Sequence, residues 1–135
     1  MGEDVKYKEI CKRGNVEELL KYREKNDIDN DYKIALYVSL DNHNKEIFKY
    51  LLKDLKININ IIGISKITYL ICISYMLNKG YSVYVFKLII NDTNLNLKEV
   101  YREIKKEYKD LQEQESILNI IGNKIKERKI NKLIK

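Results

Sequence analysis

The chain has 135 residues, the size of one domain with a sizeable core. It contains no Pro and only five Gly, a composition that argues against loop-rich β-sandwiches and barrels. Its formal net charge is +6, but the segment from Lys124 to Lys135 holds six basic residues and one acid, or +5. The remainder is nearly neutral, so an electrostatic footprint for an anion is predicted only at the C-terminal end.

We expect a soluble, cytoplasmic protein. The first ten residues are charged and lack the apolar stretch of a signal peptide. The longest apolar run, Ile67 to Leu77, is far shorter than the roughly 20 residues that span a bilayer. Cys11 and Cys72 form no CxxC pair and lie among apolar residues, which is typical of buried thiols in a reducing compartment.

Residues 4–30 are predicted to form a first unit of two helices. Gly14, between them, is expected to supply the left-handed backbone conformation that ends a helix. Asp27-Ile28-Asp29 then ends the unit. The helices are predicted from apolar stripes at helical spacing: Val5, Ile10 and Cys11 in the first, and Val16, Leu19, Leu20 and Tyr22 in the second.

Residues 31–60 form the second unit, which shows the pattern best. Its first segment, Ile34 to Leu40, alternates in a way that would also suit a strand, and the repeat described below favours a helix. Asp41 to Asn44 are predicted to form the corner that follows, because short polar side chains can cap helix ends. A broad apolar helical face comes next, and Asn58-Ile59-Asn60 is the exit.

Two further units are predicted over residues 64–96 and about 97–125. The first helix of the third unit is almost wholly apolar and should be buried on most sides, and its exit is Asn94-Leu95-Asn96. The fourth unit is less regular, and Gly122 is expected to kink or end its second helix. Residues 126–135 are a basic tail or a helix extension, in which Ile130, Leu133 and Ile134 suggest partial packing.

The three exits recur at spacings of 31 and 36 residues, a mean period near 33. A period of this length with two short helices in each unit is the signature of stacked helical repeats. One hairpin cannot bury its own apolar faces, so neighbouring hairpins must stack to make a continuous core. The prediction is therefore an all-α solenoid of helix-turn-helix units in a single domain, residues 1–125.

The chain resembles the ankyrin repeat family over about residues 4–96. Gly14-Asn15-Val16-Glu17-Glu18-Leu19 is similar to the family's corner and second helix, and the segment from His43 to Leu52 matches the same region. The family's Thr-Pro-Leu-His start appears only as Ile34-Ala35-Leu36-Tyr37 and Thr68-Tyr69-Leu70-Ile71, without Pro or His. The resemblance implies an ankyrin-like stack with degenerate β-hairpin fingers, around Asn60 to Ser65 for example.

The resemblance also implies a protein partner bound on a concave face made by first helices and fingers. Tyrosine, present 11 times, suits half-exposed interfaces, and Tyr37 and Tyr75 are the candidates for exposure. Adjacent repeats would join the candidate partner-binding residues into one patch: Asn30, Asp31, Lys33, Tyr37, Asp41, Asn42, Ser65, Lys66, Ile67, Tyr75 and Met76.

No catalytic constellation, cofactor motif or metal site is expected. The only histidine, His43, stands where the family has Gly and is flanked by Asp41, Asn42 and Asn44 rather than by further His or Cys. Nothing in the sequence pairs Cys11 with His43 as nucleophile and base. The glycines stand singly, so there is no phosphate loop.

We therefore predict a non-catalytic protein-protein interaction module, such as an inhibitor, an immunity-type protein or an effector, and a monomer rather than an oligomer. The alternative is a nucleic-acid-binding protein that neutralises phosphates with its C-terminal segment. That alternative rests on the basic residues Lys124, Lys126, Arg128, Lys129 and Lys132.

Overall fold

The computed structural model describes residues 2–26 and 32–134. This part of the chain is all-helical, with 79% of residues in helices and no strand among the described residues. The predicted all-α class is therefore confirmed. The chain divides into two compact units, Met1–Ile62 and Gly63–Lys135, which we call unit 1 and unit 2 and describe separately.

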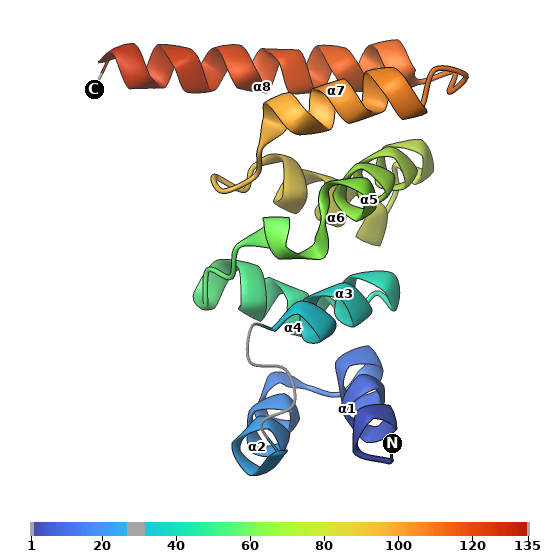
Figure 1. The fold of residues 1–135 in the computed structure, drawn as a ribbon, viewed down its shortest axis with the longest axis vertical. Coiled ribbons are helices and arrows are strands. Elements are labelled where there is room, and N and C mark those ends of the chain that lie inside the picture. The colour runs from blue at the N-terminus through green and yellow to red at the C-terminus, as the bar shows by residue number, and fades with distance from the viewer. Residues whose placement is uncertain (1, 27–31, 135) are drawn as a thin grey trace. The chain divides into compact units, whose positions relative to one another are not determined.

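Unit 1 consists of two helical hairpins (Figure 1). Helix α1 packs against α2 and α3, and α3 packs against α4. A π-helical turn and a short 3-10 helix follow α4, so the region of the predicted finger before Ser65 is helical. The elements are α1 (Gly2–Arg13), α2 (Val16–Asn26), α3 (Lys33–Asp41), α4 (Lys45–Lys49), the π turn Tyr50–Asp54 and the 3-10 helix Ile59–Ile62.

Tyrosine and arginine side chains join the first two helices. Tyr7 is fully buried, its ring stacks on Tyr22 with centroids 5.8 Å apart, and its hydroxyl accepts a hydrogen bond of 2.9 Å from Arg23 Nη1. The Arg23 guanidinium also lies 3.6 Å from the centre of the Tyr32 ring, a cation–π contact. Packing thus accounts for Tyr22, as its helical position predicted.

The corner between α1 and α2 and the corner between α3 and α4 differ in backbone conformation. His43, where ankyrin repeats have Gly, takes the left-handed conformation with φ 61°. Gly14 was predicted to do so, but its φ is not positive, and that prediction is wrong. Gly14 is required for close approach instead, because a Cβ there would lie 2.7 Å from the carbonyl oxygen of Ile10 and 2.7 Å from Glu18 Oε1.

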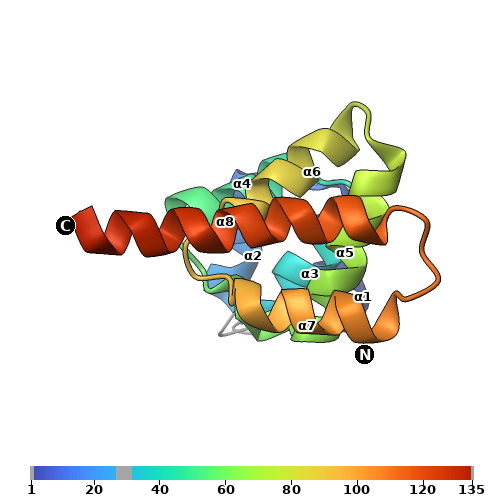
Figure 2. The same cartoon turned by 90° about the horizontal axis from the view of Figure 1, so that it is seen from above.

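Unit 2 comprises α5 (Ile64–Leu77), α6 (Tyr81–Ile90), α7 (Leu97–Glu107) and α8 (Gln114–Ile134). Helix α5 packs against α6 and α7, and α7 packs against α8. Helices α7 and α8 run antiparallel, and α8 extends beyond α7 at its C-terminal end (Figures 1 and 2). Helix α5 has 14 residues, whereas α3, the first helix of the predicted second unit, has nine.

Helix α8 corrects two predictions about the C-terminal segment. It continues through Gly122 and includes most of the predicted tail, so the glycine does not end it. Ile130, Leu133 and Ile134 were expected to pack, yet they are 55%, 86% and 78% exposed. The reason is the helical register: Ile117 and Ile121 are buried, and two further turns along the same face bring Arg128 to the inside.

The two exits in the described residues each bury their central apolar residue. Ile59 and Leu95, their central apolar residues, are 0% and 2% exposed. Their polar turns differ: the Asn58 side chain accepts a hydrogen bond from the backbone N–H of Asn60 within the first exit, whereas Asp92 accepts one from Asn94 just before the second exit. The remaining exit, residues 27–29, lies outside the described residues.

Both cysteines are buried, and no disulfide joins them. Burial raises the pKa of the Cys72 thiol to about 11.

In a Cys11→Ser variant we therefore expect the alkylation rate of Cys72 to be slow and to keep rising tenfold per pH unit from pH 7 to pH 10. An exposed thiol would level off near its ordinary pKa of 9.0. Far-UV circular dichroism at each pH would show that the fold persists. Levelling off near pH 9 in the folded protein would contradict this expectation.

Candidate interaction surfaces

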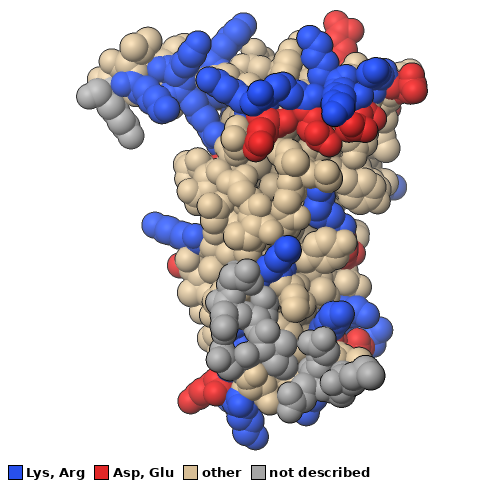
Figure 3. Space-filling model, viewed as in Figure 1, with Lys and Arg blue, Asp and Glu red and all other residues tan. Residues whose placement is uncertain are grey.

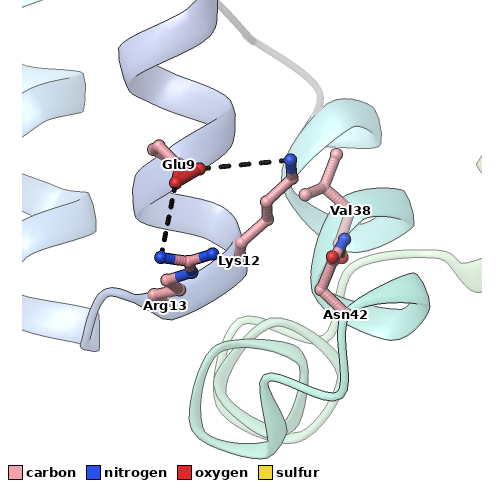
Figure 4. Close-up of polar contacts among 5 residues, drawn as sticks. All are labelled: Glu9, Lys12, Arg13, Val38 and Asn42. Carbon is pink, nitrogen blue, oxygen red and sulfur yellow. Dashed lines mark hydrogen bonds and ion pairs between the residues drawn. The ribbon is translucent and has the colours of Figure 1, made fainter.

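The predicted partner-binding residues of unit 1 lie along α3. Lys33, Tyr37 and Asp41 follow one another at intervals of four residues on one face, and all are exposed, Tyr37 by 41%. Asn42 is exposed too, and its amide donates a hydrogen bond of 2.9 Å to the carbonyl of Val38 (Figure 4). This amide therefore closes the end of α3. The other two candidates, Asn30 and Asp31, lie outside the described residues.

Helix α1 contributes charge beside the end of α3. Figure 4 shows Glu9 between Lys12 and Arg13, with ion pairs of 4.0 Å and 3.9 Å. These side chains are 43–84% exposed, so the pairs add little to stability. They make the neighbourhood of Asn42 polar and of mixed charge.

The predicted residues of unit 2 separate into exposed and buried positions on α5. Ser65 and Met76 are exposed, and Lys66 is half-buried. Ile67 is only 1% exposed, so its assignment to a binding patch is wrong. Tyr75 is half-buried, with its ring centroid 5.5 Å from that of Phe86, so it packs against α6 rather than standing exposed.

An exposed apolar strip on α5 was not predicted as such. Tyr69, Met76 and Leu77 are 45%, 46% and 52% exposed, and Ile73, at intermediate exposure, lies on the same helical face. The Lys66 ammonium lies 5.3 Å from the centre of the Tyr69 ring. We call Tyr69, Ile73, Met76 and Leu77 the α5 strip.

The sequence comparison missed Tyr69 because it paired the two helices in the wrong register. It set Tyr69 opposite Ala35, which is fully buried. The burial patterns agree instead when α5 is shifted by two residues, which sets Tyr69 opposite Tyr37, and both of these tyrosines are exposed. The matching buried sets are Ala35, Leu36, Ser39 and Leu40 in α3, and Ile67, Thr68, Ile71 and Cys72 in α5.

The basic residues of α8 fall into two groups. Lys124 Nζ donates to Asn91 Oδ1 at 2.6 Å, and Arg128 donates from Nη1 to the Leu95 carbonyl at 2.7 Å and from Nη2 to the Asp92 carbonyl at 2.6 Å. These two side chains therefore hold α8 to the loop after α6. The other group, Lys126, Lys129 and Lys132, is exposed.

Burial shifts the pKa values of several titratable groups among the described residues. No group of three or more His, Cys, Asp or Glu side chains there could hold a metal ion. Burial raises the pKa of Asp92, against the opposing effects of backbone hydrogen bonds and of Arg128, and burial also raises the pKa values of Tyr81 and Tyr108. Charged neighbours act on two of these groups: Glu103 and Glu107 also raise the pKa of Tyr108, whereas Arg128 lowers that of Asp92.

Across the described part of the chain, no helix is long and apolar enough to cross a membrane. No protein-family model, curated protein or solved structure matches the sequence or the fold.

Proposed function

We propose that this chain is a protein-binding module of ankyrin-like helical repeats, and that the α5 strip contacts the partner. The observation that carries the proposal is the row of exposed apolar side chains on one helix: Tyr69, Met76 and Leu77 are each about half exposed. Aligned apolar residues on a surface mark an interaction site more often than scattered ones do. Tyr and Met are also residue types enriched at protein interfaces.

The same helix supports the proposal by its chemistry. Lys66 lies beside Tyr69 and gives one end of the strip a polar rim, as interfaces commonly have. Tyr37 is exposed at the equivalent position of α3, between Lys33 and Asp41. The repeated placement of an exposed tyrosine on a first helix agrees with the concave-face role that the family resemblance implies.

Site-specific photocrosslinking tests the proposal. A photoreactive phenylalanine analogue at position 73 should capture a discrete protein in extracts of the source cells, and the same analogue at exposed Lys53 should not. The captured protein is then purified and its affinity is measured directly. Tyr69→Ala and Met76→Glu should each weaken binding by about tenfold or more, because central apolar residues carry about 2 kcal/mol each.

The matched control is Leu55→Glu, which changes an apolar residue of similar exposure, 38%, in unit 1. It should leave the affinity within about twofold of the original value, as is usual outside an interface. Equal losses for Leu55→Glu and Met76→Glu, or unchanged affinity for both α5 variants, would remove the α5 strip from the interface.

A further inference from the structure

Helix α7 separates its charges by face. By helical geometry, Glu99, Glu103 and Glu107 lie on one side, and Lys98 and Arg102 lie on the other. Residues Val100 and Ile104, both 0% exposed, form the buried face between these two sides. Figure 3 shows Lys and Arg gathered over α7 and α8, with Asp and Glu grouped beside them. The basic side of α7 is the one that meets α8, because Lys98 and Arg102 line a hollow together with Lys126.

Two adjoining hollows follow the seam between α7 and α8. The larger, about 490 Å³, lies between Arg102 and Lys126, and the smaller, about 280 Å³, between Lys98 and Lys132. Lys98 and Ile125 line both. The described residues that line the two hollows include no Asp or Glu. We call this continuous cationic depression the α7–α8 groove.

The groove contains an aromatic residue beside a glycine. Tyr101 lines the larger hollow at intermediate exposure, opposite Gly122. A Cβ at position 122 would lie 3.8 Å from Tyr101 Cε2, so a larger side chain there would fill the hollow. Gly inside a helix costs roughly 0.5–1 kcal/mol relative to Ala. At this position the glycine keeps the space beside the tyrosine ring open.

We propose that the α7–α8 groove binds single-stranded nucleic acid. Exposed lysines and an arginine along a groove neutralise successive phosphates, and an aromatic side chain in the same groove stacks on a base. The basic stretch from Gly122 to Lys132 is about 15 Å long at 1.5 Å per residue. The rise of 3.4 Å per nucleotide in a stacked duplex strand is a lower limit for an extended single strand, so this stretch accommodates at most about four phosphates.

The α7–α8 groove includes residues that lie outside the basic C-terminal segment. Lys98, Arg102 and Tyr101 come from α7, outside the charged C-terminal segment of the sequence. Lys129 and Lys132 are exposed on α8 and line the smaller hollow. Arg128 positions the helix instead, because its guanidinium is bonded to two backbone carbonyls. The groove is independent of the α5 strip, so it can be tested separately.

Fluorescence anisotropy with labelled 12-nucleotide dT and rU strands tests the proposal. The native chain should bind them at 50 mM salt with an affinity that falls steeply as salt increases. The triple variant Lys98→Gln/Lys129→Gln/Lys132→Gln should bind about tenfold or more weakly, and its slope of log affinity against log salt should decrease by about 2. The control Lys8→Gln/Lys49→Gln/Lys53→Gln removes the same charge from exposed positions of unit 1 and should change the affinity little.

Substitutions that alter the shape of the groove without altering its charge distinguish binding in the groove from attraction by net charge. Gly122→Leu should raise the melting temperature, because it removes a helical glycine, and should weaken binding by filling the space beside Tyr101. Tyr101→Leu should weaken binding by about fivefold or more, and Tyr101→Phe should not. Circular dichroism would verify that each variant is folded.

Three results would overturn the proposal. The first is an absence of binding by the native chain at 50 mM salt. The second is an equal loss of affinity in the two triple variants. The third is competition by a 12-residue polyglutamate peptide as effective as that by unlabelled oligonucleotide, since the groove would then recognise negative charge alone and an acidic peptide would be its ligand.

Discussion

Asn44→Ala is expected to lower the free energy of unfolding by about 2–4 kcal/mol, because one side chain performs two structural tasks. Its Oδ1 accepts from the backbone N–H of Ile47 at 3.3 Å and caps α4. Its Nδ2 donates to the carbonyls of Cys11 at 3.0 Å and Gly14 at 2.9 Å. Asn44 therefore joins the corner between α3 and α4 to the corner between α1 and α2.

Two further variants divide this loss between its causes. Asn15→Ala removes only a helix cap, since Asn15 Oδ1 accepts from the backbone N–H of Glu18 at 2.8 Å on an exposed surface. It should cost about 1 kcal/mol. Asn44→Asp keeps the capping acceptor but places a carboxylate beside two carbonyl oxygens, so it should be nearly as damaging as Asn44→Ala at pH 7.

Urea denaturation followed by circular dichroism measures all three variants. Hydrogen exchange at the backbone amides of residues 11–16 should accelerate in both Asn44 variants, and exchange in unit 2 should remain unchanged. If Asn44→Ala were no more damaging than Asn15→Ala, the bonds between the two corners would contribute nothing, and Asn44 would be an ordinary helix cap.

The sequence predicted the helices and their order because each carries an apolar stripe with helical spacing. The paired exits were also predictable, since Ile59 and Leu95 are apolar residues between polar turn formers and both are buried. The resemblance placed His43 where the family has Gly, and His43 has the left-handed φ of 61° that favours glycine. These features depend on local sequence.

The exposed surface was harder to predict because it depends on register between repeats. In α5 nearly every residue is apolar, so the stripe has no polar boundary to fix which face is buried. The sequence register set buried Ile67 opposite exposed Lys33, and a shift of two residues instead sets exposed Tyr69 opposite exposed Tyr37. The matching pairs of buried residues in α3 were the signal that could have fixed the register.

The role of the basic segment was hidden for a different reason. Formal charge identifies Lys124 and Arg128 as well as Lys129 and Lys132, but it does not show which cations are bonded within the chain. Lys124 and Arg128 are bonded to Asn91 and Leu95, each 33 residues earlier in the sequence, and no local pattern indicates these contacts. Conversely, Lys98 and Arg102 lie in a segment of mixed charge, where only the helical register separates them from the glutamates.

Arg128→Ala is expected to lower the free energy of unfolding by about 2–3 kcal/mol, since it removes two charge-assisted hydrogen bonds. The Asp92 carbonyl keeps the hydrogen bond that it accepts from the backbone N–H of Leu95. The two carbonyls, of Asp92 and Leu95, belong to the loop that follows α6. A cation near the C-terminal end of a helix is also favourable to the helix dipole. Hydrogen exchange should accelerate in residues 91–96 and in the last three turns of α8. Lys129→Ala, on the same helix and exposed, should cost less than about 0.5 kcal/mol.

The loss in Arg128→Ala should also depend on pH. Burial raises the pKa of Asp92, and the charge of Arg128 opposes that shift. Without Arg128 the pKa of Asp92 rises further, so ionising this carboxyl destabilises the folded chain more. A raised pKa in the folded state gives stability that is complete at low pH and is lost as pH rises through it. The difference between Arg128→Ala and the native chain should therefore be larger at pH 7 than at pH 4. Adding Asp92→Asn to both chains should remove that difference in pH dependence, and a pH dependence that persists would mean that another carboxyl senses Arg128.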